Sequence, residues 1–103
     1  MIAAVTVRLL KPGTFEEFRQ AVRPDPWLPR LERVLVYRND DNPDQVLTMG
    51  LFDATADEFD GLRDDPATLS EEDRRLQRVA AFEERVLLNG VYELADDVLP
   101  PAG

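Results

Sequence analysis

The residues after Met1, IAAVTVRLL (2–10), alternate in polarity and are rich in β-branched side chains, which is typical of a half-buried β-strand. Two later stretches, LERVLVYRN (31–39) and QVLTMGLFD (45–53), have the same character. Because only five residues separate them, we expect these two strands to form an antiparallel hairpin. VYELADDVL (91–99) predicts the last strand.

Three other segments carry apolar residues at helical spacing. In GTFEEFRQAV (13–22), Thr14 and Glu17 have the spacing of a capping box, and the prolines that follow end the helix. Thr55 and Glu58 predict a second helix, which Pro66 bounds, and Ser70 with Asp73 predicts the start of a third. The third helix is expected to end at the Asn-Gly pair before the last strand. Its apolar stripe is Leu76, Val79, Ala80, Val86 and Leu87.

The order β-α-β-β-α-(α)-β predicts an α+β, ferredoxin-like fold with an antiparallel four-stranded sheet and helices on one face. Residues 1–98 are expected to form one domain, and 99–103 a tail. A chain of 103 residues has nothing left to cover the other face of the sheet, so a second copy is the expected cover.

The predicted strands give the sheet two unlike faces. The uniformly apolar face, expected to lie under the helices, consists of Val5, Val7, Leu9, Val34, Val36, Leu47, Met49 and Leu51. The mixed face consists of Thr6, Arg8, Arg33, Leu35, Tyr37, Val46, Thr48 and Phe52. A mixed face suits a ligand cavity, and it also suits a polar dimer interface.

Composition excludes several classes of function. The net charge is −9 and no basic stripe is present, so nucleic acid is not an expected partner. The chain has no cysteine and no histidine, which removes thiolate nucleophiles, imidazole bases and a proximal histidine for haem. No signal peptide or membrane span is apparent, so a cytoplasmic location is expected.

The stretch YRNDDNPDQV (37–46) alternates Asp40, Asn42 and Asp44 as the first ligands of a calcium loop would. The sixth position is Gln45 where such a loop needs Gly, and the twelfth lies in a strand, where it is Leu51 in place of Glu. Asx residues and proline favour a tight turn instead, at the tip of the hairpin. No metal is predicted here.

The candidate catalytic residues are Arg8, which can stabilise a phenolate, carboxylate or enolate, and Tyr37, which can donate a proton or a hydrogen bond. The alternatives are a salt bridge from Arg8 to an acid such as Glu93, and a sheet aromatic whose hydroxyl lies at the rim. Trp27 is expected to cover a ligand, plug the core or contact a partner. The candidate substrate-binding residues are Thr6, Trp27, Arg33, Thr48, Phe52 and Tyr92.

The segments FEEFRQAV, VLVYRNDDNPDQVLTMGLFDATADEFDGL and RLQRVAAFEERVLLNGVYEL resemble the dimeric α/β-barrel superfamily, and within it the antibiotic-biosynthesis-monooxygenase-like proteins. The resemblance implies a homodimer whose sheets face each other as an eight-stranded barrel. It also implies a pocket in each subunit, between sheet and helices or inside the barrel. Members include cofactor-free oxygenases acting on polycyclic phenols, and haem-degrading enzymes.

This chain departs from that pattern at several positions. Phe52 stands where the family often has tryptophan at the end of the hairpin, the following helix lacks the frequent histidine, and Trp27 lies elsewhere. Two hypotheses remain. One is a cofactor-independent monooxygenase or cyclase/isomerase acting on an aromatic or polyketide-type molecule. The other is a non-catalytic dimeric ligand-binding or interaction module. An open apolar pocket of several hundred Å³ beside Arg8 would count against a packed, non-catalytic module.

Overall fold

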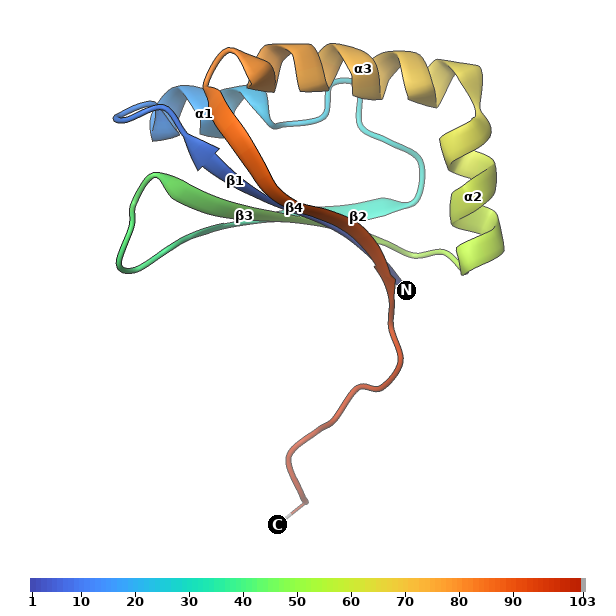
Figure 1. Cartoon of the computed structure of the whole chain (residues 1–103). Coiled ribbons are helices and arrows are strands. Elements are labelled where there is room, and N and C mark those ends of the chain that lie inside the picture. The colour runs from blue at the N-terminus through green and yellow to red at the C-terminus, as the bar shows by residue number, and fades with distance from the viewer. Residues whose placement is uncertain (103) are drawn as a thin grey trace.

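The computed structural model describes residues 1–102, which form a four-stranded sheet with three helices on one face (Figure 1). The elements in chain order are β1 (Ile2–Leu10), α1 (Phe15–Ala21), β2 (Leu31–Arg38), β3 (Gln45–Phe52), α2 (Ala56–Asp64), α3 (Pro66–Ala80) and β4 (Glu83–Glu93). The strand order is β2-β3-β1-β4, and every neighbouring pair is antiparallel. The predicted ferredoxin-like α+β fold is therefore confirmed.

The connections show which local signals fold the chain. In the β2–β3 hairpin, the Asn39 side-chain oxygen accepts from the amides of Asp41 and Asn42, so the predicted tight turn is confirmed. The capping box of Thr55 and Glu58 is present at the start of α2. The capping box predicted at Thr14 is wrong. Its hydroxyl donates to the carbonyl of Lys11 and makes no cap bond to α1.

The boundary between the third helix and the last strand differs from the prediction. α3 begins after Asp65, whose carboxylate accepts from the Thr68 amide, with Pro66 at the first helical position. It ends at Ala80, and the strand predicted for 91–99 instead occupies Glu83–Glu93. β1 requires a partner along its second edge. Pairing with residues 83–93 along nine residue pairs gives the backbone of β1 hydrogen-bond partners on that edge. This requirement outweighs the helical spacing of the apolar residues in the same segment.

The strand register places the residues of β1 and β3 on the faces opposite to the prediction, whereas Val34 and Val36 of β2 lie under the helices as predicted. Thr6 pairs with Thr48, which in turn pairs with Val36, so these three residues share the face under the helices. Val5 and Leu35 both pair with Met49 and lie on the other face, hereafter the open face. The open face consists of Ala3, Val5, Val7, Leu9, Arg33, Leu35, Tyr37, Leu47, Met49, Leu51, Arg85, Leu88, Gly90 and Tyr92. The helices therefore cover the mixed residues of β1 and β3 together with Val34 and Val36 of β2, and within residues 1–102 no helix covers the open face (Figure 1).

The core under the helices is divided into two clusters. Phe52 and Phe59 centre one cluster near α2, with their rings edge to face at 4.9 Å. Phe18 and Val79 centre the other between α1 and α3, and both are fully buried. Within residues 1–102, none of the helices combines the length and the apolar character that crossing a bilayer requires.

Candidate functional site

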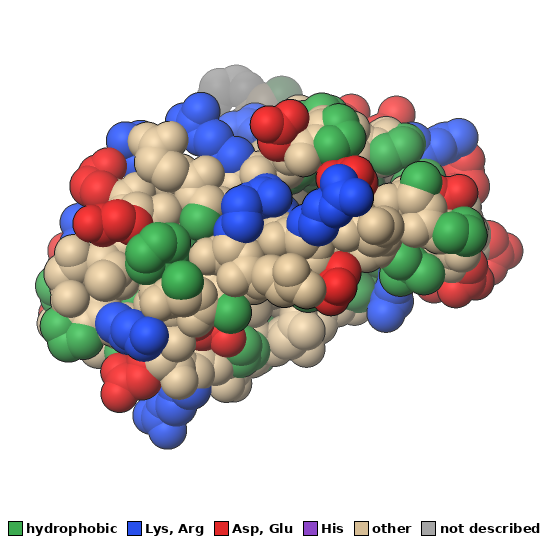
Figure 2. Space-filling model, turned by 90° about the horizontal axis from the view of Figure 1, so that it is seen from above, with side chains coloured by type: hydrophobic (Ala, Val, Ile, Leu, Met, Phe, Trp, Pro, Cys, Tyr) green, Lys and Arg blue, Asp and Glu red, His purple; other side chains and the backbone are tan. Residues whose placement is uncertain are grey.

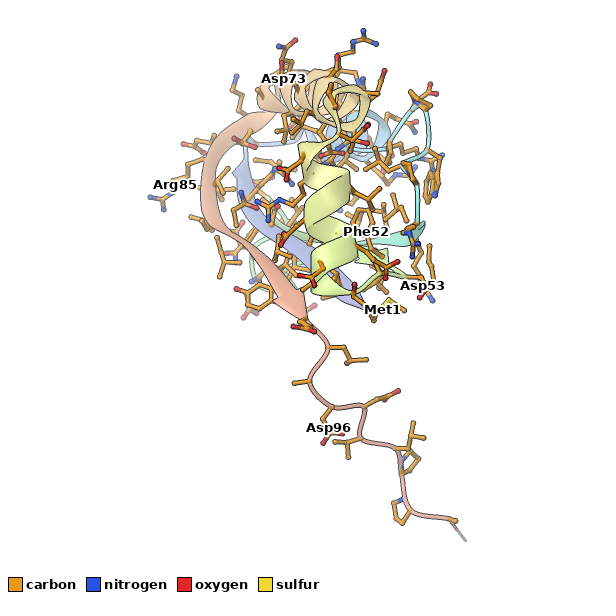
Figure 3. All side chains as sticks on the ribbon, turned by 90° about the vertical axis from the view of Figure 1, so that its right-hand side faces the viewer. Met1, Phe52, Asp53, Asp73, Arg85 and Asp96 are labelled. Atoms are coloured by element: carbon orange, nitrogen blue, oxygen red, sulfur yellow. The ribbon has the colours of Figure 1, made fainter. Side chains whose placement is uncertain are left out.

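A cleft of about 720 Å³ opens between the sheet, α2, α3 and the segment that precedes β2. Its floor is made by sheet residues with small or polar side chains, among them Ala4, Thr6, Thr48 and Gly50. One part of its wall is aromatic, because Phe52 of β3, labelled in Figure 3, and Phe59 of α2 both line it with their rings edge to face. Such a volume, with apolar walls and a few polar groups, fits a small organic ligand of several rings.

The small residues explain why the floor is open. Ala4 pairs with Gly50 across β1 and β3, and Gly50 pairs with Val34 across β3 and β2, so two adjacent positions have almost no side chain. A Cβ added at Gly50 would lie 3.5 Å from Leu31 and Phe52, at ordinary contact distance. The hollow therefore follows from side-chain size and does not require a strained backbone.

A polar strip crosses the sheet between the two core clusters. Arg8 is only 2% exposed, and its Nη1 donates to the Thr48 hydroxyl at 3.1 Å. The Thr6 hydroxyl donates to the side-chain oxygen of Asn89 at 3.2 Å. Thr6 and Thr48 line the cleft, while Arg8 lies next to Thr48 on the same face of the sheet. A ligand on this floor would meet two hydroxyl groups with a buried, ion-paired arginine beside them.

Arg8 has its own counter-ion. Its Nε donates to Glu83 Oε2 at 2.9 Å, and its guanidinium lies 5.7 Å from the centre of the Phe18 ring. Burial lowers the pKa of Arg8 from its ordinary value, and the bond to Glu83 opposes that shift. A salt bridge was among the expected alternatives for Arg8, but its acid is Glu83 at the start of β4. Glu93, the acid considered from the sequence, pairs with Ile2 at the other end of the sheet.

The rim of the cleft carries charged residues that the sequence prediction missed. Arg75 donates to both carboxylate oxygens of Glu72, from Nε at 3.2 Å and from Nη2 at 2.8 Å. Both residues line the cleft together with Leu69 and Leu76 of the same helix. The available signal was their spacing, since residues 69, 72 and 76 lie on one side of a helix. A charged pair within an apolar stripe marks a helix face that is partly open to water. Seen from above, acidic and basic side chains are interspersed over the helix layer (Figure 2).

Three candidate residues lie away from the cleft. Tyr37, Arg33 and Tyr92 belong to the open face, because they pair with Leu47, Leu51 and Ala3 respectively. The prediction that Tyr37 and Arg33 share a face with Arg8 is therefore wrong, because the hairpin register differs by one residue. Tyr37 is 55% exposed. Sites on opposite faces of one sheet cannot act on one substrate in this cleft.

The remaining candidates are divided between the cleft and its surroundings. Thr6, Thr48 and Phe52 line it, as their prediction as substrate-binding residues requires. Trp27 is half exposed, and its Nε1 donates to the Leu31 carbonyl at 2.6 Å. It does not line the cleft, although its neighbours Leu28 and Pro29 do.

Comparison with solved structures supports the same fold. A Bordetella bronchiseptica protein assigned to the antibiotic biosynthesis monooxygenases aligns with a TM-score of 0.70 and 14% identity, over 95% of this chain and 97% of that one. SnoaB, a cofactor-independent oxygenase from Streptomyces nogalater, aligns with a TM-score of 0.68 and 17% identity, over 97% of both chains. No protein-family model and no curated protein matches the sequence. The chain thus has the monooxygenase-like fold that its segments resembled, at identities that establish the fold alone.

Proposed function

We propose that this protein is a small cofactor-independent oxygenase whose substrate is a polycyclic phenol or a related polyketide-type molecule. The observation that carries the proposal is the cleft of about 720 Å³ with Thr48 on its floor and Arg8 bonded to the Thr48 hydroxyl. A cleft of this size supports the proposal over a packed, non-catalytic module, and Arg8 reaches it only through Thr48. The fold shared with SnoaB adds support.

In this proposal the substrate supplies the electrons. An acidic ring CH₂ loses a proton to give a carbanion, which adds O₂ and takes up a proton to form a hydroperoxide. Loss of water then leaves a C=O group, so CH₂ and O₂ become C=O and H₂O. The role of Arg8, through Thr48, is to stabilise the negative charge of the phenolate and the carbanion, and the apolar walls exclude water.

The cleft can be tested with a matched pair of substitutions. Ala4→Leu fills the floor, and Ala3→Leu makes the same change one residue earlier, on the open face. We expect Ala4→Leu to abolish the binding of a tricyclic hydroxyanthrone and Ala3→Leu to retain it. Binding is followed by fluorescence of Trp27, the only tryptophan, which lies beside Leu28 and Pro29 of the cleft wall. Equal binding by both variants would place the ligand elsewhere.

Turnover is tested separately, with an oxygen electrode. Thr48→Val removes the hydroxyl that accepts from Arg8 but keeps the shape, and we expect it to slow O₂ uptake by about tenfold or more. Tyr37→Phe removes a hydroxyl from the open face and serves as the control. Unchanged uptake in Thr48→Val would contradict the proposed charge stabilisation.

A second candidate function is a ligand-binding dimer without catalysis. It is favoured by the pairing of two charged groups at the site, since Arg8 is bonded to Glu83 and Glu72 is bonded to Arg75 before any ligand is present. These groups already bond each other and are less available to bond a substrate. Tight binding of the hydroxyanthrone with no O₂ uptake by the unchanged protein would establish this alternative.

A further inference from the structure

The chain leaves the sheet after β4 as an extended segment, residues 94–102, hereafter the C-terminal arm. The Leu94 amide donates to the Met1 carbonyl at 3.0 Å, and the arm beyond that bond is exposed throughout. Val98 and Leu99 are 83% and 74% exposed. Large apolar side chains that are exposed together beyond the end of β4 indicate a contact with another molecule.

The direction of the arm indicates which molecule. It departs on the side of the sheet away from the helices, and Asp96 lies clear of the body (Figures 1 and 3). The open face is on that same side. A second copy stacked on the open face would lie where the arm extends.

Charge on the open face complements the arm. Arg33 in β2 and Arg85 in β4 are exposed and lie on the two edge strands, and neither forms an ion pair within residues 1–102. Figure 3 shows the Arg85 side chain directed outward from β4. The arm carries Asp96 and Asp97, also without an ion-pair partner in the part of the chain that is described. A chain with net charge −9 repels its copies, so a basic edge is the favourable place for an acidic arm.

The arm is long enough for this contact. Nine extended residues span about 30 Å, whereas two sheets packed face to face lie about 10 Å apart. Roughly two thirds of the arm would therefore remain to lie along the second copy after crossing the interface.

We propose that the C-terminal arms are exchanged between two copies of this chain. The side chains of Val98 and Leu99 pack against the strands of the partner subunit, and Asp96 and Asp97 face its Arg33 or Arg85. This inference rests on the homodimer expected for the proposed function. It adds that the dimer is held by the arms as well as by the open faces.

The test is the dissociation constant of the full-length protein, measured by sedimentation velocity over a dilution series. Val98→Ser/Leu99→Ser removes the apolar contact without adding charge, and we expect it to raise the dissociation constant at least tenfold. Pro100→Ser/Pro101→Ser, one step further along the arm, is the control and should change it less than threefold. If the Val98/Leu99 variant has an unchanged dissociation constant, the arm exchange is wrong but the dimer is still supported. If the full-length protein is a monomer, both the arm exchange and the dimer are wrong.

The position of the arm is tested by cross-linking, because the chain has no cysteine. A benzophenone attached to Val98→Cys in ¹⁵N-labelled protein is mixed with unlabelled protein and irradiated. Exchange requires adducts between labelled arms and the unlabelled partner's sheet strands. Adducts only within labelled chains would overturn it.

Asp96→Arg/Asp97→Arg should weaken the dimer, and Arg33→Glu or Arg85→Glu should restore it. Failure of both to restore it would refute the charge pairing.

Discussion

Removing only one partner of the ion pair between Arg8 and Glu83 should cost this small domain an unusually large share of its stability. The Arg8 side chain is 3% exposed and that of Glu83 is 22% exposed. Glu83→Gln keeps the shape but leaves the guanidinium buried without a carboxylate. Removing one partner of a fully buried pair costs about 3–5 kcal/mol. Water reaches Glu83, so water can partly solvate the guanidinium once the carboxylate is gone. We therefore expect Glu83→Gln to lower the free energy of unfolding by about 2 kcal/mol, which is below that range.

The free energy of unfolding is measured in urea by Trp27 fluorescence. All variants are compared at one protein concentration, because the unfolding midpoint of a dimer depends on it. Glu16→Gln is the matched control, since its pair with Arg19 is exposed and should contribute less than about 0.5 kcal/mol. Arg8→Met/Glu83→Leu removes both charges and should lie within about 1 kcal/mol of the unchanged protein. If Glu83→Gln lowered the free energy of unfolding no more than Glu16→Gln does, and its unfolding free energy had the same dependence on urea, then the buried Arg8 would not need the charge of Glu83.

Two further predictions concern α2 and β4. The bond from the Thr55 amide lowers the pKa of Glu58, so this carboxylate stabilises the fold at neutral pH and ceases to do so as the pH falls through the lowered pKa. Glu58→Gln should therefore be less stable than the unchanged protein near neutral pH and equal to it in acid; a urea series with an equal difference at every pH would contradict this. A Cβ at Gly90 would lie 3.0 Å from the Tyr92 ring. Gly90→Ala should be destabilising with Tyr92 present and stabilising beside Tyr92→Ala, a coupling of about 1 kcal/mol in thermal unfolding; additive effects would show that the ring moves freely.

The hairpin shows why the faces could not be predicted although the strands could. In β2, Val34 and Val36 are apolar, but so are Leu35 and Tyr37, so the alternation does not say which pair faces the core. Register is then decided by the turn, where the Asn39 amide donates to the Gln45 carbonyl. The Asx residues and the proline predicted a turn here, but they did not predict that Asn39 and Gln45 would be the residues that close it. A slip of one residue moves every side chain of a strand to the other face.

Prediction of the site was limited for a related reason. Thr6, Thr48 and Phe52 were predicted to share a face, and they line one cleft, because β1 and β3 were aligned correctly with each other. Arg75 and Glu72 come from α3, and their position over the sheet depends on how that helix packs, which the spacing within one helix does not determine. Arg8 was identified as a buried or site arginine, but its counter-ion lies in a segment predicted as helix.

The cleft and the expected dimer are connected through the size of the chain. A domain of this length buries only about two thirds of its unfolded surface, and here the core is split into two clusters by a polar strip and a cleft. Because the cleft limits the apolar surface that this chain buries by itself, further burial has to come from contacts with another molecule. The open face and the arm offer exposed apolar side chains for such a contact, among them Leu88, Val98 and Leu99. Filling the cleft should therefore act on stability and on binding in opposite directions. Ala4→Leu is expected to unfold at a higher urea concentration than the unchanged protein while losing the ligand. If Ala4→Leu lost the ligand and also unfolded at a lower urea concentration than the unchanged protein, the floor of the cleft would already be packed as tightly as the fold allows.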